Sequence, residues 1–190
     1  MGVLRGRRAV RTALVEAAVD LFADHGDASV RAVASRAGVN HGLVHHYLGG
    51  KSGLRSAVLE RLSTAIYGDF DLPADATLRE LGIAVLRATE ADPRFVKILA
   101  RALLDGEVPS QLQSSFPVIA RLREASPGEP SAARAGIAEG LALGLGAIVF
   151  GPWIRAALDM TEDEFDATCD RALERVLARL DASPAGGRPG

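Results

Sequence analysis

Residues 29–51 constrain the fold of this chain more than any other segment. Ser29 is placed to cap a first short helix, because its hydroxyl can accept a hydrogen bond from a free backbone N–H. Small and apolar residues then repeat at helical spacing and predict one buried face. These residues are Val30, Val33, Ala34 and Ala37. Gly38 follows where the chain must turn, since glycine tolerates the left-handed backbone that a tight turn needs.

A second short helix is predicted directly after this turn. Asn40 can cap it, and Val39 and Val44 are expected to anchor it inward. The residues left to face outward are Asn40, His41, Gly42, His45 and His46. Two short helices joined in this way predict a helix-turn-helix, which places its second helix in the major groove of DNA.

Together with a predicted helix over residues 11–25, this segment resembles the DNA-binding domain of the tetracycline-repressor (TetR) family of transcription regulators. The family's usual run is Thr-x-x-x-Ile-Ala-x-x-Ala-Gly-Val-Ser-x-x-x-Leu-Tyr-x-His-Phe-x-Ser-Lys. Matching or chemically similar positions are Ser29, Val33, Ala34, Ala37, Gly38, Val39, Asn40, Val44, Tyr47 and Lys51. Upstream, the run Ala17-Ala18-x-x-Leu21-Phe22-x-x-x-Gly26 also matches. Three positions depart from the pattern: His45 replaces Tyr, Leu48 replaces Phe and Gly50 replaces Ser.

The resemblance implies a double-stranded DNA operator as a partner. Tyr47 and Lys51 are then expected to hold phosphates, and Ser29 to do so through the amino-terminus of its helix. We expect bases or nearby phosphates to be contacted by Asn40, His41, His45 and His46, with Gly42 allowing close approach. Ahead of the first helix, a basic arm is expected to touch phosphates or the minor groove, the alternative being a solvated tail. Its residues are Arg5, Arg7, Arg8 and Arg11.

Composition predicts an all-α chain. Alanine and leucine dominate and favour helix, whereas the alternation expected of strands is scarce. Residues 1–68 carry nine Lys/Arg against five Asp/Glu, and the remaining residues carry 13 against 19. A basic amino-terminal part on an acidic body is typical of a DNA-binding head joined to a body that does not bind DNA.

We expect three regions, with about nine helices in all. Residues 1–51 form the helix-turn-helix domain, followed by a connecting helix over 52–68. Residues 69–182 form a helical regulatory and dimerisation domain, and residues 183–190 a disordered tail. Five helical segments are predicted in the regulatory domain, at 77–91, 93–104, 110–125, 131–159 and 162–182, the last starting with a Thr161–Glu164 capping box.

The last two predicted helices are expected to form a homodimer surface. Its candidate residues are Leu141, Leu145, Ile148, Trp153, Phe165, Ala172, Val176 and Leu180. The alternative is that these faces only close the core of one chain. Dimerisation is favoured because a single head makes few contacts, whereas two heads on a twofold axis match a palindrome. The resemblance implies the same, as a four-helix bundle.

The resemblance also implies a chamber that binds a small effector. It implies a repressor as well, because repression is the commoner role in the family. Candidate wall residues are Leu62, Leu86, Phe95, Ile98, Leu99, Leu103, Phe116, Ile119 and Phe150. Apolar residues at helical spacing are also what a plain core contains. Few ionisable residues lie on these faces, so an apolar or weakly polar effector is expected.

Two other classes of protein are alternatives, a histidine-based metal-binding enzyme and a helical protein-interaction module. His41 and His45 lie one helical turn apart and could share a metal ion with His46, but a catalytic zinc site needs a third ligand and usually a base. No His-Glu-x-x-His, Gly-x-Ser-x-Gly or phosphate-binding glycine loop occurs, so we expect no enzyme, cofactor or metal. The basic head and Lys51 argue against a helical protein-interaction module.

We expect a soluble cytoplasmic protein. The single cysteine, Cys169, suits a reducing compartment, and residues 1–11 lack the apolar core of a secretory signal. The most apolar run, residues 137–158, carries Glu139 and Arg155 and is rich in glycine and alanine. It is therefore expected to be a buried or interface helix, not a membrane span.

Overall fold

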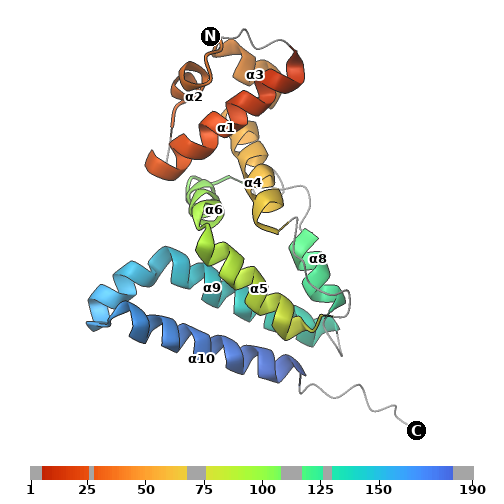
Figure 1. The fold of residues 1–190 in the computed structure, drawn as a ribbon, viewed down its shortest axis with the longest axis vertical. Helices are drawn as coiled ribbons and strands as arrows, with labels where there is room; N and C mark the ends of the chain where they lie inside the picture. The colour runs from red at the N-terminus through yellow and green to blue at the C-terminus, as the bar shows by residue number, and fades with distance from the viewer. Residues whose placement is uncertain (1–5, 26–27, 68–75, 108–116, 126–129, 182–190) are drawn as a thin grey trace. The chain divides into compact units, whose positions relative to one another are not determined.

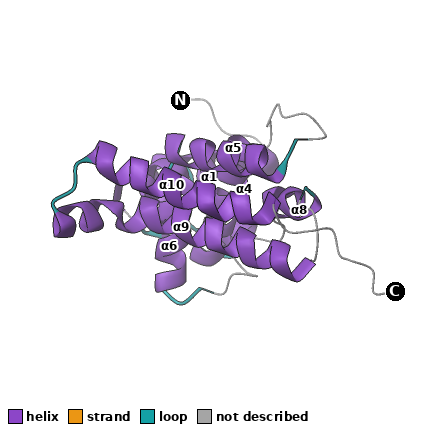
Figure 2. Cartoon of the chain, turned by 90° about the horizontal axis from the view of Figure 1, so that it is seen from below, coloured by secondary structure: helices purple, strands orange, loops and turns teal. Residues whose placement is uncertain are grey.

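A computed structural model describes residues 6–25, 28–67, 76–107, 117–125 and 130–181. These described ranges contain nine helices and no strand, so the predicted all-α class is confirmed (Figures 1 and 2). The helices are α1 (Arg7–His25), α2 (Val30–Arg36), α3 (Gly42–Leu48), α4 (Lys51–Tyr67), α5 (Leu78–Ala91), α6 (Arg94–Leu104), α8 (Pro117–Glu124), α9 (Pro130–Leu158) and α10 (Glu162–Asp181).

Helix packing divides the chain into two compact units. Residues 1–68 and 92–115 form the first, and residues 69–91 and 116–190 form the second. The predicted division differs, because it assigned everything after residue 68 to one regulatory domain. Helix α6 instead packs on α1 and α4 of the first unit. Its apolar face is buried there through Phe95, Val96, Ile98 and Ala102.

Helix α1 is the centre of the first unit, since α2, α3, α4 and α6 all pack against it. Leu14 and Ala18 are fully buried, and Phe22 is nearly so. The small Ala17 and Ala18 side chains allow neighbouring helices to approach closely. Leu14, Ala18 and Phe22 recur at four-residue steps, so they form one buried face of this helix.

Local hydrogen bonds fix both ends of α2. The Ala32 N–H donates to the Ser29 hydroxyl at 3.1 Å, so the predicted cap is confirmed. At the other end Gly38 has a φ of +68°, which confirms the predicted left-handed turn. The Gly38 and Val39 N–H groups donate to the carbonyls of Ser35 and Ala34, and this pattern satisfies the end of the helix.

Three glycines form the junction between α3 and α4. Gly49 and Gly50 both have positive φ angles, +71° and +99°. Gly53, in the first turn of α4, lies so close to the end of α3 that an added Cβ would stand 1.7 Å from the Leu48 carbonyl oxygen. The first turn of α4 therefore touches the backbone of α3 directly, which fixes how α3 is held.

We expect Gly53→Ala to destabilise the first unit by about 2–3 kcal/mol, because the methyl group meets backbone that cannot rotate away. Ser56→Ala, one turn further along α4, is the matched control, since that position already carries a Cβ and the substitution should change stability by less than about 1 kcal/mol. Urea unfolding followed by circular dichroism measures both variants. Equal stability of Gly53→Ala and the wild type would contradict this packing.

The second unit is built on an antiparallel pair, α9 and α10, with α5 packed on both (Figure 1). Glycines of α9 allow close approach, because a Cβ at Gly144 would collide with Leu86 of α5 and one at Gly151 would crowd Phe165 of α10. The predicted capping box of the last helix is confirmed: the Glu164 N–H donates to the Thr161 hydroxyl and the Thr161 N–H donates to the Glu164 carboxylate.

Candidate nucleic-acid interface

Helix α3 has one buried face and one exposed face. Val44 is fully buried and Leu48 nearly so, and both point into the first unit. The exposed residues of the segment are Asn40, His41, Gly42, His45 and His46, as the sequence predicts. The imidazoles of His41, at the start of α3, and of His45 and His46, within it, can form hydrogen bonds to base edges and phosphates.

Asn40 organises the start of α3. Its side-chain Oδ1 accepts a hydrogen bond from the Gly42 N–H at 2.8 Å, while His41 makes no side-chain cap. Asn40 therefore supplies the side-chain hydrogen bond expected of a cap, but from one residue ahead of the N-cap position, which His41 occupies. With Oδ1 engaged by the backbone, the amide NH₂ of Asn40 is the group that a nucleic acid would meet.

Tyr47 lies at the edge of this surface between a histidine and an arginine. Its ring meets the His46 ring edge-on, with centroids 4.7 Å apart, and the Arg7 guanidinium carbon lies 5.9 Å from the Tyr47 centroid. Arg7 and Arg8 belong to α1 and not to a free arm, which corrects the predicted start of that helix. Arg5 lies outside the described residues.

Ser29 and Lys51 flank the recognition segment. The Ser29 side chain is exposed, but its hydroxyl oxygen already accepts the Ala32 N–H. Lys51 is the first residue of α4 and is half-buried. Ser29 directly precedes α2, and Lys51 follows α3, so the helix-turn-helix fixes the backbone at both positions.

A buried arginine lies in α4, the helix that follows α3 in the chain. The Arg55 side chain, in α4, is only 3% exposed. Its guanidinium donates to Asp105 at 2.7 Å and to Glu107, and the Ser52 hydroxyl donates to Glu107 at 2.9 Å. These carboxylates follow the end of α6, so the cluster ties the start of α4 to the segment after α6. Sequence reasoning missed it, because no local pattern pairs residues fifty positions apart.

The electrostatics of the cluster follow from its geometry. Burial by itself would lower the pKa of Arg55, but hydrogen bonds to Asp105 and Glu107 raise it above its ordinary value. Hydrogen bonding to Arg55 also lowers the pKa of Asp105, and the charges of Arg55, Arg101 and Lys51 act in the same direction. Arg55 and Asp105 therefore each favour the charged form.

We expect Arg55→Met to lower the free energy of unfolding by about 2–4 kcal/mol, because it removes the cation paired with Glu107 and one of the two arginines paired with Asp105. Arg61→Met is the matched control on the same helix: Arg61 pairs with Glu16, both side chains are about half exposed, and the loss should stay below about 1 kcal/mol. Chemical denaturation at pH 7 measures the two variants.

The same comparison at low pH tests whether the ion cluster causes this difference in the free energy of unfolding. The lowered pKa of Asp105 means that its contribution is present above the ordinary carboxyl range and is lost as the pH falls through its folded-state pKa. The gap between the wild type and Arg55→Met should therefore shrink below about pH 4. A gap that is constant from pH 7 to pH 3 would rule out the ion cluster as its source.

The predicted chamber residues are divided between the two units. Leu62, Phe95 and Ile98 are buried in the first unit, where Leu99 is half-buried and Leu103 is 43% exposed. In the second unit Leu86 and Ile119 are half-buried. Phe150 is 58% exposed, so the single chain does not enclose it as a chamber wall. Phe116 lies outside the described residues.

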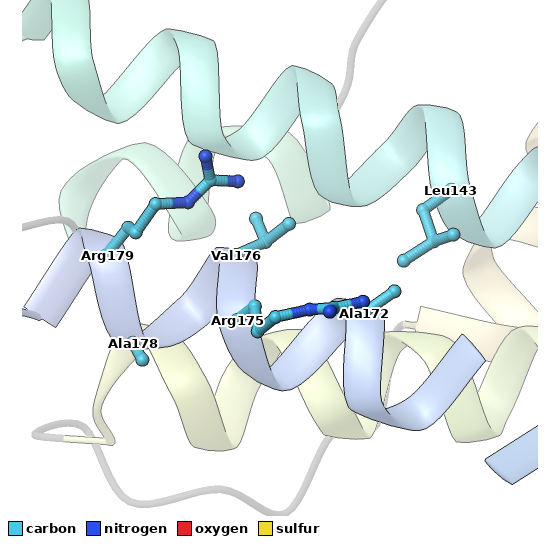
Figure 3. Close-up of a pocket in the computed structure, with 6 residues that line it drawn as sticks. All are labelled: Leu143, Ala172, Arg175, Val176, Ala178 and Arg179. Atoms are coloured by element: carbon cyan, nitrogen blue, oxygen red, sulfur yellow. The ribbon is translucent and has the colours of Figure 1, made fainter. Parts of the chain in front are cut away.

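The second unit carries an open groove of about 620 Å³ between α9 and α10 (Figure 3). Its lining residues are Leu143, Ala172, Arg175, Val176, Ala178 and Arg179. Val176, predicted to contact a second chain, is already buried within its own chain, because α10 turns this face toward α9. That placement corrects the prediction.

The other predicted dimer residues differ in exposure. Leu141, Leu145, Ile148, Phe165 and Ala172 are half-buried, and Trp153 is 71% exposed. Leu180 is helical, but its side chain lies outside the described residues. Within the described ranges, no three His, Cys, Asp or Glu residues come together as a metal site.

Known proteins resemble this chain over most of its length. Residues 14–58 match the sequence model for bacterial regulatory proteins of the tetR family. HTH-type transcriptional repressor Rv3405c of Mycobacterium tuberculosis (strain ATCC 25618 / H37Rv) is 39% identical over 182 residues, which cover 90% of this chain and 91% of that protein. HTH-type transcriptional regulator BetI of Rhizobium meliloti (strain 1021) is 28% identical over 189 residues, covering 94% and 93%.

Solved structures share the fold. The multidrug binding protein EbrR, complexed with imidazole, superimposes with a TM-score of 0.59 at 22% identity, covering 94% of this chain and 97% of that one. Mycobacterium smegmatis BioQ superimposes with a TM-score of 0.55 at 20% identity, covering 88% and 97%. The region matched by the sequence model, residues 14–58, runs from α1 into α4 and so contains the whole exposed surface of α3.

Proposed function

Because this chain belongs to the tetR family of bacterial regulatory proteins, it is a DNA-binding transcription regulator and not an enzyme, and we propose that it acts as a homodimeric repressor on a palindromic operator in the cytoplasm. The observation that carries this proposal is the exposed imidazole surface of α3 above a buried Val44–Leu48 face. A short helix anchored in this way can enter the major groove without rearranging the unit that carries it.

In this proposal the contacts fall into two classes. His41, His45 and His46 face base edges, and Asn40 joins them through its amide NH₂. The phosphates that flank the groove are held by Arg7 and Tyr47, which lie in contact, and by Lys51 and Ser29. Phosphate contacts fix where the head lies on the duplex, and the imidazoles then discriminate between sequences.

Lys51→Ala should weaken binding to all duplexes about equally and lower the slope of log K against log salt by about one for each half-site. Fluorescence anisotropy from 50 to 300 mM salt measures this on a duplex selected from a random pool. Lys97→Ala, which removes an exposed lysine of α6, is the control and should leave the slope unchanged. An unchanged slope for Lys51→Ala would remove Lys51 from the interface.

The proposed dimer surface is the exposed side of α9. Phe150 is 58%, Trp153 71% and Leu158 65% exposed in the single chain. By length and composition α9 is the only helix among the described residues that could cross a membrane, and just 11% of its apolar stretch is buried within the chain. A second copy would cover these aromatic and aliphatic side chains, as the predicted homodimer requires.

Trp153→Asp should give a folded monomer, because the side chain is solvent-exposed in one chain but would bury an unpaired charge between two. Analytical ultracentrifugation at micromolar concentration measures the state, and circular dichroism checks the fold. Ala120→Asp, on an exposed position of α8, is the control and should remain dimeric. A Trp153→Asp protein that stays dimeric would move the interface elsewhere, and Phe150→Asp provides an independent second variant.

We also propose that a small apolar effector releases the repressor from its operator. EbrR, which has the same fold, is described as a multidrug binding protein, and this motivates the search for such a ligand. Helix α6 packs on α4, and Arg55 ties the end of α6 to the start of α4. A ligand that displaces α6 would therefore move the helix that supports α3.

An effector found by thermal-shift screening should bind less tightly in the presence of operator, since coupling between two sites is reciprocal. A coupling of about 1–3 kcal/mol corresponds to a 5- to 150-fold change in affinity. Isothermal titration with and without the operator duplex measures it. Equal ligand affinity in both titrations would show that the ligand does not act as a switch.

A further inference from the structure

The His45 ring lies close to Gly50, across the turn from α3 to α4. A Cβ built on Gly50 would stand 3.3 Å from Nδ1 and 3.4 Å from Cε1 of His45. Gly50 is buried, although its neighbour Gly49 is exposed. A side chain at position 50 would therefore stand in tight contact with one edge of the imidazole, and the ring would have to shift by a few tenths of an ångström to admit it.

The two adjacent glycines share a backbone conformation but differ in what a side chain on them would meet. Both have positive φ angles, +71° for Gly49 and +99° for Gly50, which residues with side chains rarely adopt. A Cβ on Gly49, however, would meet nothing within 4 Å. Both positions require glycine for the backbone, but Gly50 alone also makes room for His45.

This contact joins two of the three departures from the family run. His45 stands where that run has Tyr, and Gly50 where it has Ser. A serine at position 50 would bring its Cβ into tight contact with the imidazole and add a hydroxyl oxygen beyond it. The two departures are therefore neighbours in space, and a side chain at position 50 would shift the His45 ring from the position seen here.

We propose that Gly50 is a positioning residue for His45, and that the two together determine which base pair the middle of α3 reads in each half-site. His45 is exposed, while Val44 and Leu48 of the same helix are buried, so its free edge faces outward. Without a side chain at position 50 the imidazole can keep this position while its outer edge meets a base. The inference rests on the proposed insertion of α3 into the major groove.

The test is a double-mutant cycle on the full-length protein. The duplex selected by the wild type is varied one base pair at a time, and affinities are measured for His45→Ala, Gly50→Ser and the double variant. His45→Ala should lose discrimination at one base pair per half-site by about tenfold, since each of two copies contributes one hydrogen bond. Gly50→Ser should lose it at the same base pair, and should lose little more when His45 is already alanine.

Gly49→Ser is the matched control. It imposes a side chain on a positive φ without touching His45, so it should weaken all duplexes alike and keep the base preference. If Gly50→Ser behaves in the same way as Gly49→Ser, with an unchanged preference in both backgrounds, Gly50 serves only the backbone and the proposal is wrong. Thermal unfolding of each variant establishes that the protein compared is folded.

A measurement without DNA tests the contact itself and uses the smaller Gly50→Ala substitution. The His45 ring signals in a carbon–proton NMR spectrum should shift in Gly50→Ala and stay in place in Gly49→Ala. Unmoved His45 signals in Gly50→Ala would overturn the positioning role, whatever the DNA results. Shifted signals in a protein that selects no duplex would instead overturn the DNA-reading role and leave the ring contact standing.

Discussion

One buried cation determines how the first unit supports its DNA-facing helices. The Arg55 side chain is 3% exposed, and its guanidinium lies 6.0 Å from the Phe22 ring centroid while it binds Asp105 and Glu107. A charge at this depth is tolerated only when it is paired. The two carboxylates are therefore obligatory neighbours, and through them α1, α4 and the end of α6 keep one arrangement.

The recognition helix depends on that arrangement because it is too short to exist alone. Seven residues form less than two complete turns, and isolated helices of that length are unstable in water. Asn40 supports its start, Gly49 ends it, and Gly53 presses the first turn of α4 against its last carbonyl. The positions of the imidazoles on its outer face therefore depend on the packing of the first unit, because the helix is not stable by itself.

The second unit uses side-chain size to separate two faces of one apolar helix. Where α9 meets α5 and α10 it carries glycine, as at Gly144 and Gly151, so that Leu86 and Phe165 can fit closely. On its exposed side it carries Phe150 and Trp153. Small residues suit a contact that is complete within the chain, whereas exposed aromatics suit one that a second copy would complete.

The sequence by itself determined the features that act over a few residues. The Ser29 cap, the Gly38 turn, the Thr161 capping box and the helical class were all predictable, because a cap or a turn joins atoms three or four residues apart. The run from Ala17 to Phe22 likewise identified the first helix of the domain through its resemblance to the family. The recognition segment was predictable for the same reason, since its exposed residues alternate with buried Val44 and Leu48 on one short helix.

The tertiary structure alone decided which faces meet. Periodicity indicates that a helix has an apolar face, but it does not say what covers that face. Helix α6 packs within the first unit, and Val176 is buried within its own chain. Helical spacing predicted neither contact. The Arg55 pairs and the His45–Gly50 contact were hidden in a related way. Each depends on how two segments cross, and crossing is set by packing throughout the unit and not by local spacing.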